Sequence, residues 1–161
     1  MLEISEDDLS GEDVRALLAL HLSSMRDGSP PGHSFALDLS GLRAPDVTVW
    51  TVRRAGEVAG IGALKTLDDG GGEIKSMRTH PDHLRQGVAA ALLDKIVADA
   101  RARGLVRLSL ETGSGPAFEP ALALYRKRGF VPGGPFGEYS SRDFNRFFHL
   151  DLDPPQREDC S

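Results

Sequence analysis

From Gly87 onward the hydrophobic residues follow the spacing of a helix, and a segment predicted as a strand lies on each side of this stretch. This arrangement restricts the chain to a small number of folds. Glu73–Thr79 is predicted as a strand that the following proline ends. From Gly87 the apolar residues recur every three or four positions, and the helix they predict stops at Gly104. Leu105–Glu111 then reads as a strand. A strand, a helix and a strand in this order predict a right-handed parallel crossover, and therefore an α/β protein.

The other segments add strands and helices around this unit. An apolar ladder predicts a helix over residues 11–25, on the positions Val14, Leu17, Leu18, His21, Leu22 and Met25. Val47–Val52 and Val58–Leu67 predict a hairpin whose second strand is weakened by Gly60 and Gly62, and strand 73–79 completes a three-stranded meander. Further elements are expected at 35–39 (a short helical turn), 105–111 (strand), 120–128 (helix), from Phe130 (strand) and 147–152 (strand). This order predicts an α/β sandwich in which a mixed sheet carries helices on its faces.

The composition excludes several classes of function. The 161 residues, 40% of them hydrophobic, fit one domain, assigned to residues 1–152, followed by a flexible polar tail at 153–161. A formal net charge of −5, spread along the chain, argues against a nucleic-acid partner. No apolar run reaches the roughly 18 to 20 residues of a bilayer span, so we expect a soluble, cytoplasmic protein with no membrane partner. The single cysteine, Cys160, excludes an internal disulfide, a cysteine-based zinc site and a positioned cysteine nucleophile.

A candidate anion site lies where the predicted strand meets the predicted helix, at Thr79–Ala89. A glycine and small residues that open a helix bring unpaired N–H groups and the positive end of the helix dipole to one point. Such a point favours an anion such as a pyrophosphate. Small residues also suit any strand–loop–helix connection in which helix and sheet pack closely, so this pattern alone leaves both interpretations open.

Two motifs resemble those of the GNAT-type N-acetyltransferase superfamily. Leu84–Ala89 resembles the Arg/Gln-x-x-Gly-x-Gly/Ala pattern, and Ala121–Phe130 resembles Ala-x-x-Leu-Tyr-x-x-x-Gly-Phe. The resemblance extends over residues 45–152 and departs from the family at Leu84, which replaces Arg or Gln, and at Phe118, where an Asn is common. Three further stretches are similar to the YsnE-type branch, often labelled indole-acetate acetyltransferases: Glu73–Arg78, Leu110–Gly115 and Pro135–Tyr139. The resemblance implies the acyl-CoA N-acyltransferase fold, a mixed central sheet of six to seven strands with helices on both faces.

The resemblance also implies acetyl-CoA as co-substrate. The pyrophosphate is expected on backbone amides at 85–90, and the pantetheine arm on the backbone at 77–79, where two parallel strands splay into a V-shaped cleft. The implied cofactor-binding residues are Met77, Arg78, Thr79, Leu84, Arg85, Gln86, Gly87, Val88, Ala89, Ala90 and Ser114. His80 and His83 have no third ligand candidate nearby, so no metal is expected, and capping or solvent contact is the better interpretation for them.

Acetyl transfer to an amine needs a proton acceptor for the amine and a proton donor for the departing thiolate. Glu73 lies fourteen residues before Gly87, the spacing at which some family members place a carboxylate base. Glu111 is the second candidate for the base and Glu138 the third. Tyr125 matches the family's usual general acid. The structural alternatives are a solvated carboxylate at a hairpin end for Glu73 and a core residue for Tyr125.

The acceptor-binding residues implied by the resemblance are Arg43, Phe136 and Tyr139, in the two loops that wall the acceptor site in this superfamily. The expected activity is transfer of an acetyl group from acetyl-CoA to a primary amine of a small molecule or peptide, by direct attack in a ternary complex. An acyl-CoA-binding sensor without turnover is the alternative, and transfer of a different acyl group is a more distant one. A homodimer through the last strands is expected from the resemblance.

Overall fold

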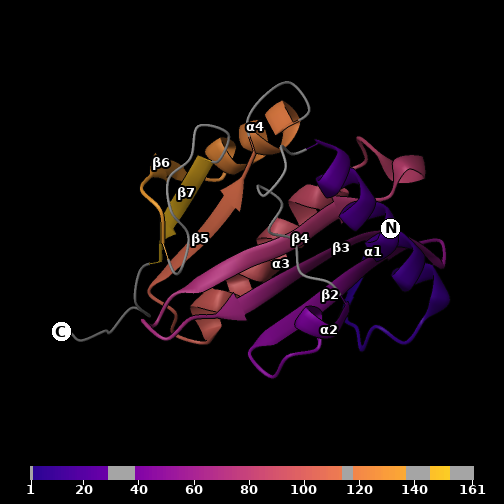
Figure 1. The fold of residues 1–161 in the computed structure, drawn as a ribbon, viewed down its shortest axis with the longest axis horizontal. Coiled ribbons are helices and arrows are strands. Elements are labelled where there is room, and N and C mark those ends of the chain that lie inside the picture. Colours follow the sequence, from indigo (N-terminus) through magenta and orange to yellow (C-terminus); the bar gives the residue numbers. More distant parts are fainter. Residues whose placement is uncertain (1, 29–38, 114–117, 137–145, 153–161) are drawn as a thin grey trace.

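A seven-stranded sheet with helices on both faces forms the core of the protein (Figure 1). The computed structural model describes residues 2–28, 39–113, 118–136 and 146–152. Its elements, in chain order, are β1 (Leu2–Glu6), α1 (Glu12–Gly28), α2 (Leu39–Leu42), β2 (Val47–Arg54), β3 (Glu57–Thr66), β4 (Gly72–Thr79), the 3-10 helix η1 (Pro81–His83), α3 (Val88–Ala102), β5 (Arg107–Thr112), α4 (Glu119–Lys127), β6 (Val131–Gly133) and β7 (Arg146–Asp151).

The sheet is mixed, as predicted. Its strand order is β1-β2-β3-β4-β5-β7-β6. Only β4 and β5 pair in parallel, and every other neighbouring pair is antiparallel. The predicted meander and the predicted parallel pairing of the two strands that flank the central helix are therefore confirmed.

Each face of the sheet has its own hydrophobic core. In Figure 1, α1 lies in front of the sheet and α3 behind it. On the α1 face, Val14, Leu17 and Leu18 pack against Ile61 and Ala63 of β3. The core on the α3 face combines α3, α4 and the strands, with the buried members Leu92, Leu93, Ile96, Leu122, Leu64, Leu108 and Leu110 among them. The sheet therefore separates two hydrophobic cores.

β1 is absent from the sequence prediction, and it adds a fourth strand to the meander. It pairs antiparallel with β2, from Leu2 opposite Arg54 to Glu6 opposite Trp50. Only Leu2 and Ile4 are apolar in this segment, and they pack on the rim of the α3-face core. Two apolar residues at the start of a chain give too short an alternation to stand out, so only the pairing with β2 reveals the strand.

Gly60 and Gly62 allow α3 to lie close to β3. A Cβ atom added at Gly60 would stand 2.5 Å from Val88 Cγ1, and one at Gly62 would stand 2.6 Å from Met77 Sδ. These glycines, which the sequence marks as weak points of the strand, are therefore required by packing. β3 nevertheless runs unbroken over Glu57–Thr66.

The helices agree with the predicted ones to within a few residues, because their apolar spacing and end signals are strong. Gly87 precedes α3 in the left-handed region at φ 80°, and Pro120 lies in the first turn of α4. The expected turn at 35–39 falls almost entirely outside the described residues, and α2 begins at Leu39. None of the described helices combines the length and the apolar character that crossing a bilayer requires.

Candidate active site

β4 contains a bulge near its centre. It advances from Lys75 to Arg78 while the paired part of β3 advances by one residue fewer. Ser76, inside this stretch, has a φ of 59°, in the left-handed region. Because a bulge re-aims the side chains around it, Met77 packs on the α3-face core and Arg78 reaches α1 on the other face. The sequence indicates the strand but not this change of register.

β4 and β5 separate soon after they begin. Their parallel ladder ends at Glu73 and Ser109. We call the remainder, residues 74–79 of β4 and 110–112 of β5, the β4–β5 splay. Backbone groups that a ladder no longer uses can pair with an extended ligand laid between the strands. The splay that the resemblance implied is therefore present in the structure.

The first turn of α3 forms an open cradle at the end of β4. Gly87 caps the helix without a side-chain hydrogen bond, and Arg85 before it also has a positive φ, of 62°. Residues 84–87 are exposed, and no atom lies within 4 Å of the position where a Cβ of Gly87 would stand. The free N–H groups of the first turn are thus accessible, and their dipole suits an anion such as a pyrophosphate. Leu84, 56% exposed, supplies no polar group to it.

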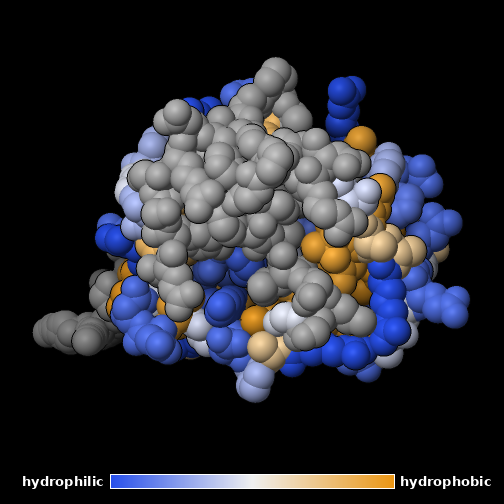
Figure 2. All heavy atoms as spheres, in the orientation of Figure 1, coloured by the Kyte–Doolittle hydropathy of each residue, from blue (hydrophilic) through white to orange (hydrophobic). Residues whose placement is uncertain are grey.

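Four polar residues of β4 and β5 lie on the α1 face beside the splay, and we call them the polar cluster: Glu73, Lys75, Ser109 and Glu111. Their neighbours Ile74, Leu108 and Leu110 belong to the core on the α3 face, and side chains alternate along a strand. Figure 2 shows this face, where hydrophilic side chains are visible over β4 between the regions drawn in grey. The cluster therefore borders the splay on one side of the sheet.

Burial and charge perturb one carboxyl group of the polar cluster. Lys75 Nζ lies 3.0 Å from Glu73 Oε2, and both side chains are less than a tenth exposed. Burial raises the pKa of Glu111 to about 7; Lys75 opposes this increase and the charge of Glu73 adds to it. Ser109 Oγ lies 2.8 Å from His149 Nδ1. Glu111 thus has the pKa of a group that exchanges protons near neutral pH.

Arg78 and His21 form a second polar contact on the α1 face. Arg78 Nε donates a hydrogen bond to His21 Nδ1 over 3.1 Å. Burial first, and the Arg78 charge second, lower the pKa of His21 to about 4. Burial also lowers the pKa of Arg78. The sequence places His21 on an apolar helix ladder, and its position opposite β4 is a tertiary feature that the ladder does not reveal.

Tyr125 lies on the opposite face of the sheet. It is buried in the α3-face core beside Phe130, with ring centroids 5.7 Å apart. Burial raises its pKa to about 12, so the phenol stays protonated at neutral pH. The structure therefore places Tyr125 and Glu111 on opposite faces, and the splay is where those faces meet. The core position is consistent with both interpretations of Tyr125.

The two predicted acceptor-binding residues that the structure describes, Phe136 and Arg43, lie in different parts of the molecule. Phe136 packs against Phe147 and His149, with ring centroids 5.9 and 5.7 Å apart, and lines an open pocket of about 590 Å³. Arg43 lies instead near the start of α1, where its Nη2 is 3.4 Å from the Leu9 carbonyl oxygen. No contact among the described residues joins Arg43 to the polar cluster. Ser114, Tyr139 and Glu138 lie outside the described residues.

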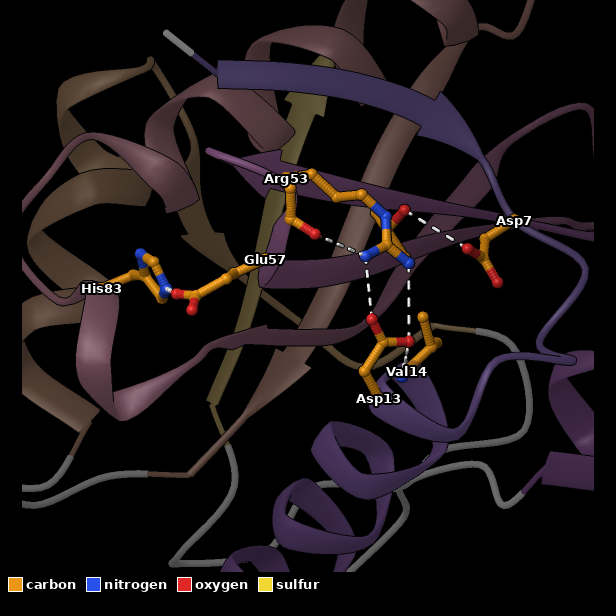
Figure 3. A network of polar contacts seen from close by, with 8 residues as sticks. Asp7, Asp13, Val14, Arg53, Glu57 and His83 are labelled. Atoms are coloured by element: carbon orange, nitrogen blue, oxygen red, sulfur yellow. Dashed lines mark hydrogen bonds and ion pairs between the residues drawn. The ribbon is translucent and has the colours of Figure 1, made fainter.

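His80 and His83 have structural contacts. His80 Nδ1 accepts a hydrogen bond from the Asp82 N–H over 3.0 Å, so His80 caps η1 as expected. His83 is buried, and its Nε2 lies 3.3 Å from Glu57 Oε1 (Figure 3). In the same view Arg53 joins β2 to Asp13 of α1. Within the described ranges, no three His, Cys, Asp or Glu side chains are grouped as a metal site would need.

Comparison with known proteins confirms the resemblance seen in the motifs. Residues 14–130 match the Acetyltransferase (GNAT) family. The chain is 49% identical to the uncharacterized N-acetyltransferase YedL of Escherichia coli K12, over 94% of this chain and 96% of that protein. It is 50% identical to the uncharacterized N-acetyltransferase YsnE of Bacillus subtilis 168, over 86% and 91% of the two chains.

Solved structures share the fold. A Klebsiella pneumoniae protein assigned to the acyl-CoA N-acyltransferases superposes with a TM-score of 0.80 at 29% identity, over 95% of this chain and 99% of that one. A Bacillus subtilis acetyltransferase in complex with CoA superposes with a TM-score of 0.69 at 18% identity, over 94% and 99% of the chains.

Proposed function

The chain belongs to the GNAT acetyltransferase family, and we propose that it moves an acetyl group from acetyl-CoA to a primary amine of a small molecule or peptide, by direct attack in a ternary complex. The observation that carries this proposal is the β4–β5 splay, which has the polar cluster on one face and Tyr125 on the other. An amine that enters from the α1 face would then meet a proton acceptor. A leaving group that departs toward α4, on the opposite face, would meet a hydrogen-bond donor.

Apart from Ser114, which lies outside the described residues, the cofactor-binding residues proposed from the sequence fall in two stretches, 77–79 and 84–90. The backbone amides at 85–90 would hold the pyrophosphate, and the backbone of Met77–Thr79 would hold the pantetheine arm. When bound, acetyl-CoA supplies an activated acetyl thioester. Because Leu84 offers no polar side chain, the cradle depends on backbone N–H groups. The bulge at Ser76 releases backbone N–H groups near Met77 from the ladder, and one of them would stabilise the oxyanion.

Glu111 is the proton acceptor that the structure favours, ahead of Glu73. An amine reaches the site mostly as an ammonium ion at neutral pH, so the base must accept a proton and then release it to solvent. A group with a pKa of about 7 does both, which suits Glu111. Glu73 Oε2 is already engaged by the Lys75 ammonium. Glu73 would then act on Glu111 through its charge.

Tyr125 would act on the departing sulfur. With a pKa of about 12, its phenol remains protonated and donates a hydrogen bond. A thiolate is a much weaker base than this phenolate, so stabilisation by the hydrogen bond is favoured over complete proton transfer. This role is narrower than that of the general acid expected from the sequence.

Calorimetric titration with acetyl-CoA, followed by thiol release with a panel of amines, tests the proposal. We expect saturable binding, and release with at least one amine. E111Q should lower kcat/KM by about 10² or more, since general bases contribute this much, and Y125F should lower kcat. Both variants should keep the acetyl-CoA affinity of the parent. E119Q, which changes an exposed glutamate at the start of α4, is the matched control.

Each other outcome has a distinct meaning. Binding without release from any amine would favour a sensor of the same fold. Absence of binding would contradict the phosphate cradle at α3. If E111Q keeps full activity and E73Q loses it, Glu73 rather than Glu111 is the general base.

A further inference from the structure

A half-buried arginine beside the splay has no acidic partner in the described part of the chain. The contact that Arg78 makes there is the hydrogen bond from its Nε to His21. Ion pairs join other arginines to carboxylates, as Arg53 to Asp13 and Arg103 to Asp99, but among the residues that the structure describes none involves Arg78. A guanidinium keeps its charge in proteins, and removing it from water without an anion costs free energy. An anionic ligand would recover that cost.

His21 orients this charge without neutralising it. An arginine Nε–H can only donate, so His21 Nδ1 must carry the lone pair and the ring must be neutral. The low pKa of His21, about 4, agrees with this assignment. With Nε occupied, the two terminal nitrogens of Arg78 remain as a planar fork, the geometry that receives a carboxylate through two parallel hydrogen bonds.

The location of Arg78 favours the acceptor over the cofactor as the source of the anion. Its side chain meets α1, whereas the helix that would hold the pyrophosphate, α3, packs on the opposite face. Three residues of strand rise by about 10 Å, so the bulge keeps Arg78 within that distance of Lys75 along β4. Glu111 lies on the same face, on the neighbouring strand. A small molecule can therefore reach both groups.

We propose that Arg78, oriented by His21, binds a carboxylate of the acceptor, so that the acceptors are amines that carry an acidic group, such as amino acids or short peptides with a free carboxyl end. This inference rests on the proposed acetyl transfer and specifies its substrate class. Arg78 is then a specificity-determining residue, and His21 is a positioning residue.

Paired acceptors test the inference. Thiol release is measured with L-amino acids and with their carboxamides, which carry the same amine without the acid, at saturating acetyl-CoA. The measured quantity is the ratio of kcat/KM for acid over amide, compared between parent and variant so that differences in amine basicity cancel. We expect R78Q to lower this ratio about thirtyfold or more, as for the loss of one partner of a buried charge pair. The KM for acetyl-CoA should not change.

Four further variants separate specificity from folding. R107Q, which removes an exposed arginine paired with Asp151, should leave the ratio unchanged. H21N keeps a hydrogen-bond acceptor near the place of Nδ1 and should keep most of the ratio. H21L removes that acceptor and should lower the ratio, and the contrast with H21N isolates the hydrogen bond from the side-chain volume. R78K keeps the charge without the fork and should give an intermediate ratio, which provides a second reading should R78Q fold poorly.

A binding measurement distinguishes failure of this inference from failure of the proposed function. N-acetyl-L-amino acids and their amides are titrated into the full chain with CoA present, which requires no turnover. Preferential binding of the acids that R78Q abolishes supports the inference even if no amine accepts an acetyl group. An unchanged ratio and equal binding of acids and amides would overturn it. So would a rise in the KM for acetyl-CoA in R78Q, which would assign Arg78 to the cofactor.

Discussion

Replacing Glu111 by glutamine should stabilise the fold while it removes the proposed base. Burial raises the pKa of Glu111 from its ordinary 4.5 to about 7. Between pH 4.5 and pH 7, therefore, the carboxyl group is protonated in the native state and ionised in the unfolded chain. Stability from this group is therefore complete below pH 4.5 and falls as the pH rises to 7. The full interval corresponds to about 3 kcal/mol, and partial exposure reduces the expected cost at pH 8 to about 2 kcal/mol.

Urea unfolding of the parent and E111Q at several pH values measures this cost. We expect E111Q to exceed the parent by about 2 kcal/mol in free energy of unfolding at pH 8, or roughly 4 to 8 °C in Tm. The difference should vanish near pH 4.5. E119Q, which makes the same change at an exposed position, is the matched control. An E111Q protein no more stable than the parent at pH 8, or a gain independent of pH, would refute the reasoning.

Further predictions concern pH dependence, packing and the cradle. kcat/KM should rise with pH through an apparent pKa near 7. E73Q should lower this apparent pKa, because the Glu73 charge raises the pKa of Glu111. The pH profiles of kcat/KM for the parent and for E73Q check the direction of the change. G60A should lose about 1 to 3 kcal/mol in urea unfolding, because its Cβ would meet Val88 Cγ1 at 2.5 Å, whereas G134A, with no atom within 4 Å, should lose little. G87A should lose about 1 kcal/mol through its positive φ and also weaken acetyl-CoA binding; G104A, with a φ of 77° at the far end of α3, should lose only stability.

The raised pKa of Glu111 connects stability with the proposed activity. A carboxyl group that is easy to ionise would stabilise the fold but would retain too little affinity for the proton of an ammonium ion. The burial that destabilises its charged form is also what brings its pKa near neutrality. A gain in stability with a loss of activity in the same variant is the expected signature of a site under this constraint.

Helices and their ends could be predicted from the sequence with little error. The apolar spacing of α3 lies in contiguous residues, and Gly87 and Gly104 mark its ends by a backbone conformation that glycine adopts easily. The cradle at its first turn follows from the same local signals. β1 was not predicted, because an edge strand with only two apolar residues has no clear alternating pattern of its own. Its strand conformation depends on pairing with β2.

The sequence by itself determined the α/β order of elements, the family motifs and the candidate carboxylates, because each of these depends on residues that are neighbours along the chain. Only the tertiary structure decided how the carboxylates differ. Glu73 is held by Lys75, while Glu111 on the next strand has a perturbed pKa. It also decided that His21, on an apolar ladder of α1, meets Arg78 beyond a bulge in β4. Burial and charge at these positions arise from groups far apart in the chain, so no local pattern can encode them.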